Sequence, residues 1–174
     1  MAGILKRNTD LTPTLEEQTH IAALVSQIQN ALETISLDPA AFTSCQVDEF
    51  RIVGSYKKGT MIRGKNEADI VVILHSQPTL DMITKLSDKV LEELLKTSPG
   101  HPFAITVTDY GFSVTNREVN SSVRMLLTTQ ICHMRRMDGR QFVATNLLHK
   151  HMSAIRHVRW FEGMVWMYIC YSLP

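Results

Sequence analysis

Cysteine is scarce in this sequence, and the few cysteines are far apart. The chain of 174 residues contains three, Cys45, Cys132 and Cys170, with no Cys-x-x-Cys spacing. A disulfide framework or a zinc knuckle needs several cysteines at short spacings. The composition therefore predicts neither and fits a reducing compartment.

Long apolar runs and an excess of one charge are also missing. Lys6 and Arg7 near the amino terminus have no apolar run behind them, which argues against a secretory signal. The strongly apolar stretch at 164–171 is far shorter than the ~20 residues of a membrane-spanning helix. A net charge of +1 argues against a surface that attracts nucleic acid everywhere, while a local basic patch remains compatible with it. We therefore expect a soluble nuclear or cytosolic protein.

What the chain does contain predicts one α/β (α+β) domain, a mixed sheet flanked by helices. Its length allows a hydrophobic core, and its 44% apolar and 20% charged residues are ordinary for a globular domain. Apolar residues at three- and four-residue steps predict helices over 13–38, 79–96 and 142–161, with a short helical segment within 55–63. Short β-branched runs predict strands at 50–53, 68–74, 103–107, 112–115 and 123–128. Residues 1–12 are expected to be an amino-terminal extension.

One segment combines residue types suited to phosphate chemistry. Gly54 allows the backbone to approach a ligand, and Ser55 begins a short helix whose free amides can hold a phosphate. Lys57 and Lys58 add positive charge, and Asp69 lies within a predicted buried strand that would hold it rigidly. Gly-Ser alone is a common turn, but its combination with Asp69 at this spacing is a strong signal.

This pattern resembles the nucleotidyltransferase superfamily, which includes polymerase beta and the poly(A) polymerases. Its members share an apolar-Gly-Ser step, a short helix and then Asp-x-Asp or Asp-x-Glu on a strand. Thirteen residues separate Ser55 from Asp69 here, which suits that family. More closely, the sequence is similar to the DZF domain, and the resemblance runs from about Leu5 to Glu162. It is carried by residues 53–60 and 68–74, with further matches at 5–8, 10–11, 17–18, 78–80, 154–157 and 159–162.

The carboxylates of the superfamily pattern are incomplete. Two-metal phosphoryl transfer needs clustered carboxylates, yet the second position is Val71, and the strand at 123–127 offers Arg124 in place of a third. We therefore predict no catalytic residues, no metal site and no cofactor beyond weak nucleotide or magnesium binding. Asp69 then either pairs with a lysine of the 57–65 segment or keeps a residual metal contact. The predicted vestigial nucleotide and phosphate site comprises Gly54, Ser55, Lys57, Lys58 and Asp69.

Basic and histidine clusters remain to be interpreted. The basic clusters are Lys57, Lys58, Arg63 and Lys65, then Arg135, Arg136 and Arg140, and then Arg156 and Arg159. A solvated surface explains all three, and only the first favours phosphate contact, with Arg63 and Lys65 as candidates for contact with RNA. His149 and His151 are two residues apart on a predicted helix and do not face each other, so a surface or helix-face role is expected in place of zinc binding.

The resemblance implies a non-catalytic subunit of a nuclear RNA-binding complex, with the cytoplasm as a second location. It would pair with a second DZF-domain protein that carries double-stranded-RNA-binding domains, contact RNA mainly through that partner, and act in transcription regulation and RNA processing. The alternatives are an active or residual template-independent nucleotidyltransferase and a module that binds nucleotide without transfer.

The end of the chain departs from the family pattern. Residues 13–162 are expected to be the nucleotidyltransferase-like part of a DZF domain, and residues 163–174 a divergent tail. The helical half that supplies the family's dimer interface is not recognised after Glu162. A truncated form of this kind is expected to be poorly stable or poorly assembled alone, because its last helix would lose packing partners.

Overall fold

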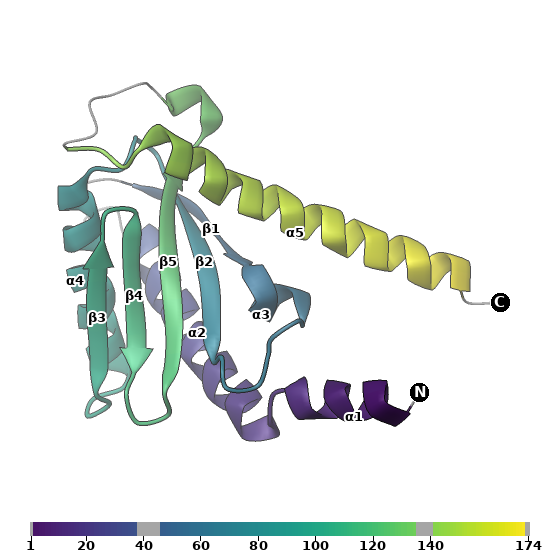
Figure 1. Ribbon diagram of the computed structural model, residues 1–174. Coiled ribbons are helices and arrows are strands. Elements are labelled where there is room, and N and C mark those ends of the chain that lie inside the picture. Colours follow the sequence, from purple (N-terminus) through teal and green to yellow (C-terminus); the bar gives the residue numbers. More distant parts are fainter. Residues whose placement is uncertain (1, 38–45, 135–140, 173–174) are drawn as a thin grey trace.

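The computed structural model describes residues 2–37, 46–134 and 141–172, with side chains over 3–37, 46–134 and 141–164. Five strands form one mixed sheet in the order β1-β2-β5-β4-β3 (Figure 1). Only β2 and β5 run parallel; the other neighbouring strands are antiparallel. The strands are β1 (Val47–Val53), β2 (Glu67–Leu74), β3 (Phe103–Thr108), β4 (Gly111–Asn116) and β5 (Ser121–Thr129). The predicted mixed α/β architecture is confirmed.

The helices differ from the prediction mainly at the two ends of the chain. Residues predicted as an extension form helix α1 (Ala2–Leu11), and the last helix, α5 (Thr145–Ser172), continues well beyond residue 161. The other helices are α2 (Leu15–Leu37), α3 (Gly54–Lys58), α4 (Leu80–Thr97) and the 3-10 turn η1 (Ile131–His133). Among the described helices, none has the length and apolar character that crossing a membrane requires.

The start of α2 is fixed by a capping box. The Glu17 backbone N–H donates to Thr14 Oγ1 at 3.1 Å, and the Thr14 backbone N–H donates to the Glu17 carboxylate at 2.8 Å. The same carboxylate accepts a bond of 2.9 Å from the backbone N–H of Gly64. These backbone hydrogen bonds, from Thr14 first and then from Gly64, lower the pKa of Glu17. The predicted helix start is confirmed, and it also ties α2 to the loop before β2.

The two faces of the sheet are covered by different helices. α2 and α4 pack on one face, α2 over β1, β2 and β5 and α4 over β3 and β4, and the core there includes Ile70, Val72 and Met125. α5 crosses the opposite face (Figure 1), where Ile155 and Val158 pack with Val71. Because both faces of β2 are covered at its centre, the strand is a continuous apolar run without alternation. Asp69 lies on the face that α5 crosses, two residues before Val71.

Candidate functional site

The predicted short helix after Gly54 forms one turn directly beside Asp69. Gly54 has a φ of +74°, and α3 ends at Gly59, which has a φ of +66° and donates its N–H to the Tyr56 carbonyl at 3.2 Å. A Cβ atom placed on Gly54 would lie 2.4 Å from Asp69 Oδ2. Glycine is therefore required at position 54 both by the left-handed backbone and by the close approach of a carboxylate.

The partner of Asp69 is Arg124. The parallel pairing of β2 and β5 places the two residues in register. Arg124 Nε donates to Asp69 Oδ1 at 2.7 Å, and Arg124 Nη1 lies 3.9 Å from Glu67 Oε2. The hydrogen bond to Asp69 raises the pKa of Arg124. Of the two alternatives for Asp69, the structure shows ion pairing, but the partner is Arg124 and not a lysine of the 57–65 segment, because strand register brings Arg124 against it.

Val71, at the position of the superfamily's second carboxylate, is an apolar contact between β2 and α5. Its side chain is fully buried and packs in a cluster with Ile155 and Val158. A valine side chain offers no metal ligand, and the helix above it keeps water away from this part of β2.

The residues present do not fit the divalent metal that the superfamily uses. One carboxylate oxygen of Asp69 is bonded to a guanidinium, the next inward-facing position is Val71, and the neighbouring strand supplies a cation. Within the described parts of the chain, no three His, Cys, Asp or Glu side chains are close enough together to hold a metal ion. A cation at this point would meet the positive charge of Arg124 at the distance of one hydrogen bond.

The two lysines predicted to contact phosphate lie against α5. Lys57 Nζ is 3.0 Å from Glu162 Oε1, and Lys58 Nζ is 6.0 Å from the centre of the Phe161 ring. Ser55 is half-buried in the single turn of α3. Of the five residues in the predicted phosphate site, only Gly54 and Asp69 are thus shown in contact with each other.

The remaining basic residues are spread over separate surfaces. Arg63 and Lys65 are exposed in the loop between α3 and β2, and the Arg63 backbone N–H donates to the Leu11 carbonyl at 2.9 Å. Arg156 and Arg159 are exposed on α5. The cluster of Arg135, Arg136 and Arg140 lies outside the described residues.

The two neighbouring histidines of α5 have opposite environments. His149 is exposed, whereas His151 is 4% exposed and its Nδ1 lies 2.7 Å from the Leu127 carbonyl oxygen. Burial lowers the pKa of His151, and this outweighs the upward effect of the Leu127 carbonyl. Of the two predicted roles, His149 has the surface one and His151 the helix-face one, because this face of α5 packs on β5.

A cavity of about 310 Å³ lies between Asp69 and the underside of α5. Its polar walls are formed by Asp69, Tyr110, Arg124, Lys150 and His151, and its apolar walls by Leu126, Leu147 and Ala154. The sequence assigned no role to Tyr110 or Lys150. Tyr110 lies between two predicted strands and Lys150 within a predicted helix, and neither local pattern indicates that the two segments meet over β5.

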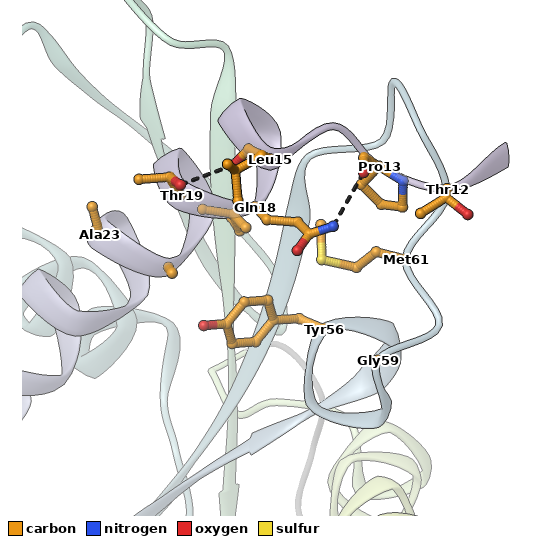
Figure 2. Close-up of a pocket in the computed structure, with 11 residues that line it drawn as sticks. Thr12, Pro13, Leu15, Gln18, Thr19, Ala23, Tyr56, Gly59 and Met61 are labelled. Atoms are coloured by element: carbon orange, nitrogen blue, oxygen red, sulfur yellow. Dashed lines mark hydrogen bonds between the residues drawn. The ribbon is translucent and has the colours of Figure 1, made fainter. Parts of the chain in front are cut away.

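A larger hollow of about 820 Å³ lies between the start of α2 and the segment from Tyr56 to Met61. Figure 2 shows the Tyr56 ring extending into it, opposite Gln18 and Thr19 of α2. Gln18 Nε2 is bonded to the Pro13 carbonyl, and Thr19 Oγ1 to the Leu15 carbonyl, so both polar groups already have partners in the chain. None of the predicted phosphate-site residues lines this hollow.

Two solved structures are similar to this chain in fold, and a third has a weaker likeness to it. The chain is similar to CdnC of E. coli MS115-1 in its complex with HORMA-deltaN, with a TM-score of 0.58 and 17% sequence identity over 90% of this chain and 47% of that one. For CdnC with ATP the TM-score is 0.54 and the identity 17%, over 89% of this chain and 48% of that one. The Cid1 poly(U) polymerase with Mg and 3′-dATP gives a TM-score of 0.49 and 15% identity, over 71% of this chain and 35% of that one. The chain has a nucleotidyltransferase-like fold and spans about half the length of the CdnC structures.

The family within this fold class is also defined. The model of the DZF N-terminal domain matches residues 1–165, nearly the whole chain. The chain therefore belongs to the DZF N-terminal domain family, as its Gly-Ser and Asp segments predicted. The match includes α1 and continues to residue 165, past Glu162, where the resemblance recognised in the sequence ends.

Proposed function

We propose that this chain is a non-catalytic, nucleotidyltransferase-like subunit of a nuclear RNA-binding complex. The observation that carries the proposal is the ion pair between Asp69 and Arg124, with Nε and Oδ1 2.7 Å apart. In this arrangement the one carboxylate retained from the superfamily pattern is neutralised by a side chain of its own domain. Val71, buried under α5, removes the next ligand position.

The chemistry of nucleotidyl transfer explains why Val71 and Arg124 argue against catalysis. Metal ions in such reactions activate the attacking oxygen and stabilise the leaving phosphate, and clustered carboxylates hold them. Arg124 stands at the third carboxylate position. The side chain next to Asp69 is therefore positively charged and repels a cation, whereas a carboxylate there would bind it. The domain acts in this proposal as a folded scaffold that has kept the shape of the superfamily without its reaction.

The complex would form with a second DZF-domain protein that carries double-stranded-RNA-binding domains. Membership of the DZF family supports this partner class, and the net charge of +1 supports RNA contact made mainly by the partner. The complex would act in transcription regulation and RNA processing, in the nucleus and secondarily in the cytoplasm. Arg63 and Lys65, both exposed beside β2, would supply the direct RNA contacts of this chain.

The catalytic part of the proposal is tested by a transfer assay. The purified chain is incubated with labelled nucleotides, an RNA primer and either magnesium or manganese, alongside Asp69→Ala. We expect no incorporation above that of Asp69→Ala. Incorporation by the wild-type chain that disappears in Asp69→Ala would show an active enzyme and overturn the proposal.

The assembly part is tested by co-expression. We expect this chain to co-elute with a DZF-domain partner that carries double-stranded-RNA-binding domains, and the affinity of the complex for duplex RNA to follow the partner. Arg63→Ala with Lys65→Ala should weaken that binding only slightly. Duplex RNA binding by this chain alone that equals the binding of the complex would contradict the assignment of RNA contact to the partner.

A further inference from the structure

We propose that β3 is an interaction surface through which two copies of this chain associate, with their β3 strands paired antiparallel so that the two sheets become one. The inference goes beyond the role proposed above and does not depend on it. β3 lies at the end of the sheet opposite β1, away from Asp69 and α3. It is also a different surface from the helical half to which the family resemblance assigns the dimer interface.

β3 is an edge strand without the usual protection against pairing. In the part of the chain that the structure describes, no segment pairs with its outer side. Folded proteins commonly protect such an edge with lysine, proline or a β-bulge. β3 consists only of Phe, Ala, Ile, Thr and Val, and its pairing with β4 has no shift in register. The strand is therefore suited to pairing with a further strand.

The hydrogen-bond pattern of the β3–β4 hairpin shows which backbone groups of β3 point outward. The Arg117 N–H donates to the Pro102 carbonyl at 3.4 Å, so these two residues are a hydrogen-bonded pair. Such pairs alternate along an antiparallel ladder. The residues of β3 whose N–H and carbonyl groups point away from β4 are therefore Phe103, Ile105 and Val107.

Two of these three residues have a free outward donor. The Phe103 N–H is already bonded to the His101 carbonyl at 2.9 Å. The N–H groups of Ile105 and Val107 have no corresponding bond within the described residues. A strand that pairs with this edge must therefore offer acceptors opposite Ile105 and Val107 and needs no acceptor opposite Phe103.

A second copy of β3 meets this requirement when the antiparallel pair is centred on Ile105. Ile105 then faces Ile105 of the second copy, and Val107 faces Phe103 of the second copy. The Ile105 N–H donates to the opposite Ile105 carbonyl, and the Val107 N–H donates to the opposite Phe103 carbonyl. Each copy donates two hydrogen bonds and accepts two. The edge is thus complementary to itself about a twofold axis, as an interface between identical subunits requires.

The side chains support the same register. Phe103 and Ile105 pack against the core, whereas Val107, which lies on the same face of the sheet, is 45% exposed. In the joined sheet Val107 lies beside Phe103 of the second copy, and pairs of an aromatic and a β-branched residue stabilise sheets. Asp109 is then opposite His101 of the second copy, so no like charges face each other. Because each copy contributes a single strand, the dimer is small, weak and reversible.

The oligomeric state of the full chain tests the proposal. Sedimentation equilibrium up to millimolar concentration should show a reversible equilibrium of monomer and dimer. Val107→Lys places a charge beside Phe103 of the second copy and should weaken dimerisation about tenfold or more. Ile62→Lys adds the same charge at a residue that is 48% exposed in the loop between α3 and β2, and should leave dimerisation unchanged. A monomer at every concentration, or equal effects of the two variants, would overturn the proposal.

Cysteine cross-linking tests the register independently of any loss of stability. Ala104 faces Thr106 of the second copy in a pair without hydrogen bonds, whose Cα atoms are about 4.5 Å apart. Mild oxidation of the double variant Ala104→Cys with Thr106→Cys should give a dimer linked between positions 104 and 106, located by peptide mapping. Each single variant keeps the three native cysteines but has no new cysteine opposite another, and should not form this link. Equal cross-linking of the single variants, or a double variant without the 104–106 link, contradicts the proposed pairing.

Discussion

The close approach of Gly54 and Asp69 restricts which residue can stand at position 54. The left-handed backbone at Gly54 disfavours any side chain, and Asp69 Oδ2 occupies the space that a Cβ would need. The same glycine allows α3 to begin immediately beside the strand that carries the aspartate. The Gly-Ser pattern is therefore retained here for a structural reason that does not depend on catalysis.

Substitution at Gly54 and at Gly59, the residue that follows α3, separates backbone strain from the contact with Asp69. Gly54→Ala should lower the free energy of unfolding by about 2 to 4 kcal/mol, from backbone strain and displacement of Asp69 together. Gly59→Ala has a similar positive φ but no atom within 4 Å of the added Cβ, and should cost only about 1 kcal/mol. Urea denaturation measures both, and equal losses would show that contact with Asp69 contributes nothing.

His151 should make stability depend on pH. Its pKa is lowered in the folded chain, first by burial and then slightly by Lys150, against an ordinary value of 6.5. Below pH 6.5 the unfolded chain binds a proton that the folded chain does not, so stability should fall as the pH drops from 6.5 toward the folded pKa. Above 6.5 both states are neutral and this effect disappears.

The comparison of His151→Gln with His149→Gln checks whether stability falls at acid pH because of His151. Unfolding free energies are measured between pH 7 and pH 5. His151→Gln should lose part of the acid dependence, even though it is less stable overall, while His149→Gln on the exposed side of α5 should keep the wild-type slope. An unchanged slope in His151→Gln would contradict the prediction.

At the scale of elements, local patterns predicted most of the fold. The strands and the amphipathic α4 follow from the spacing of apolar residues, and Thr14 with Glu17 marks the start of α2. The sequence did not predict α1 because this helix buries little apolar surface and so has no helical spacing of apolar residues. Ile4, for example, is 76% exposed. The Gly54, Ser55 and Asp69 spacing predicted that the short helix and Asp69 lie together, because that part of the motif is local.

The rest of the site depends on contacts between distant segments. Asp69 and Arg124 are 55 positions apart in sequence, and they meet only through the parallel register of β2 and β5. Lys150 and His151 reach the cavity because of the angle at which α5 crosses the sheet. No local pattern in the sequence encodes either relationship.

The capping box of α2 can be tested directly. Thr14→Ala removes the acceptor of the Glu17 N–H and should destabilise the protein by about 1 kcal/mol. Thr19→Ala, on the exposed surface of the same helix, should change stability by less than ~0.5 kcal/mol. Thermal denaturation of both variants gives the difference, and a Thr14→Ala protein as stable as Thr19→Ala would show that the cap is dispensable.

The packing of α5 on β2 is tested at Val71. Val71→Asp, which restores the Asp-x-Asp pattern, places a carboxylate between apolar side chains and should destabilise the fold by about 3 kcal/mol or more. Val71→Ala removes the same methyl groups without adding charge and should cost about 1 to 3 kcal/mol. Denaturant titration compares the two, and a Val71→Asp protein at least as stable as Val71→Ala would mean that α5 does not seal this position.

At the scale of the whole molecule, α1 and the carboxyl-terminal part of α5 project from the same side of the sheet (Figure 1). Ile4 and Leu5 of α1 are mostly exposed, so this helix adds little to the folded core. Removal of residues 1–7 should change the free energy of unfolding by less than ~0.5 kcal/mol, whereas Leu24→Ala in the core should cost about 2 to 5 kcal/mol. A large loss on removing residues 1–7 would show that α1 stabilises the domain.

The pairing of Asp69 with Arg124 also bears on how such a domain can change over generations. Replacing Arg124 by an acid would leave two carboxylates side by side in neighbouring strands, and replacing Val71 by an acid would bury a charge that has no partner. Each single step toward a three-carboxylate cluster therefore lowers stability, and the effects are coupled because the residues are neighbours. A change at Asp69 or Arg124 alone would leave the other charge without its partner, so the two positions are expected to change together.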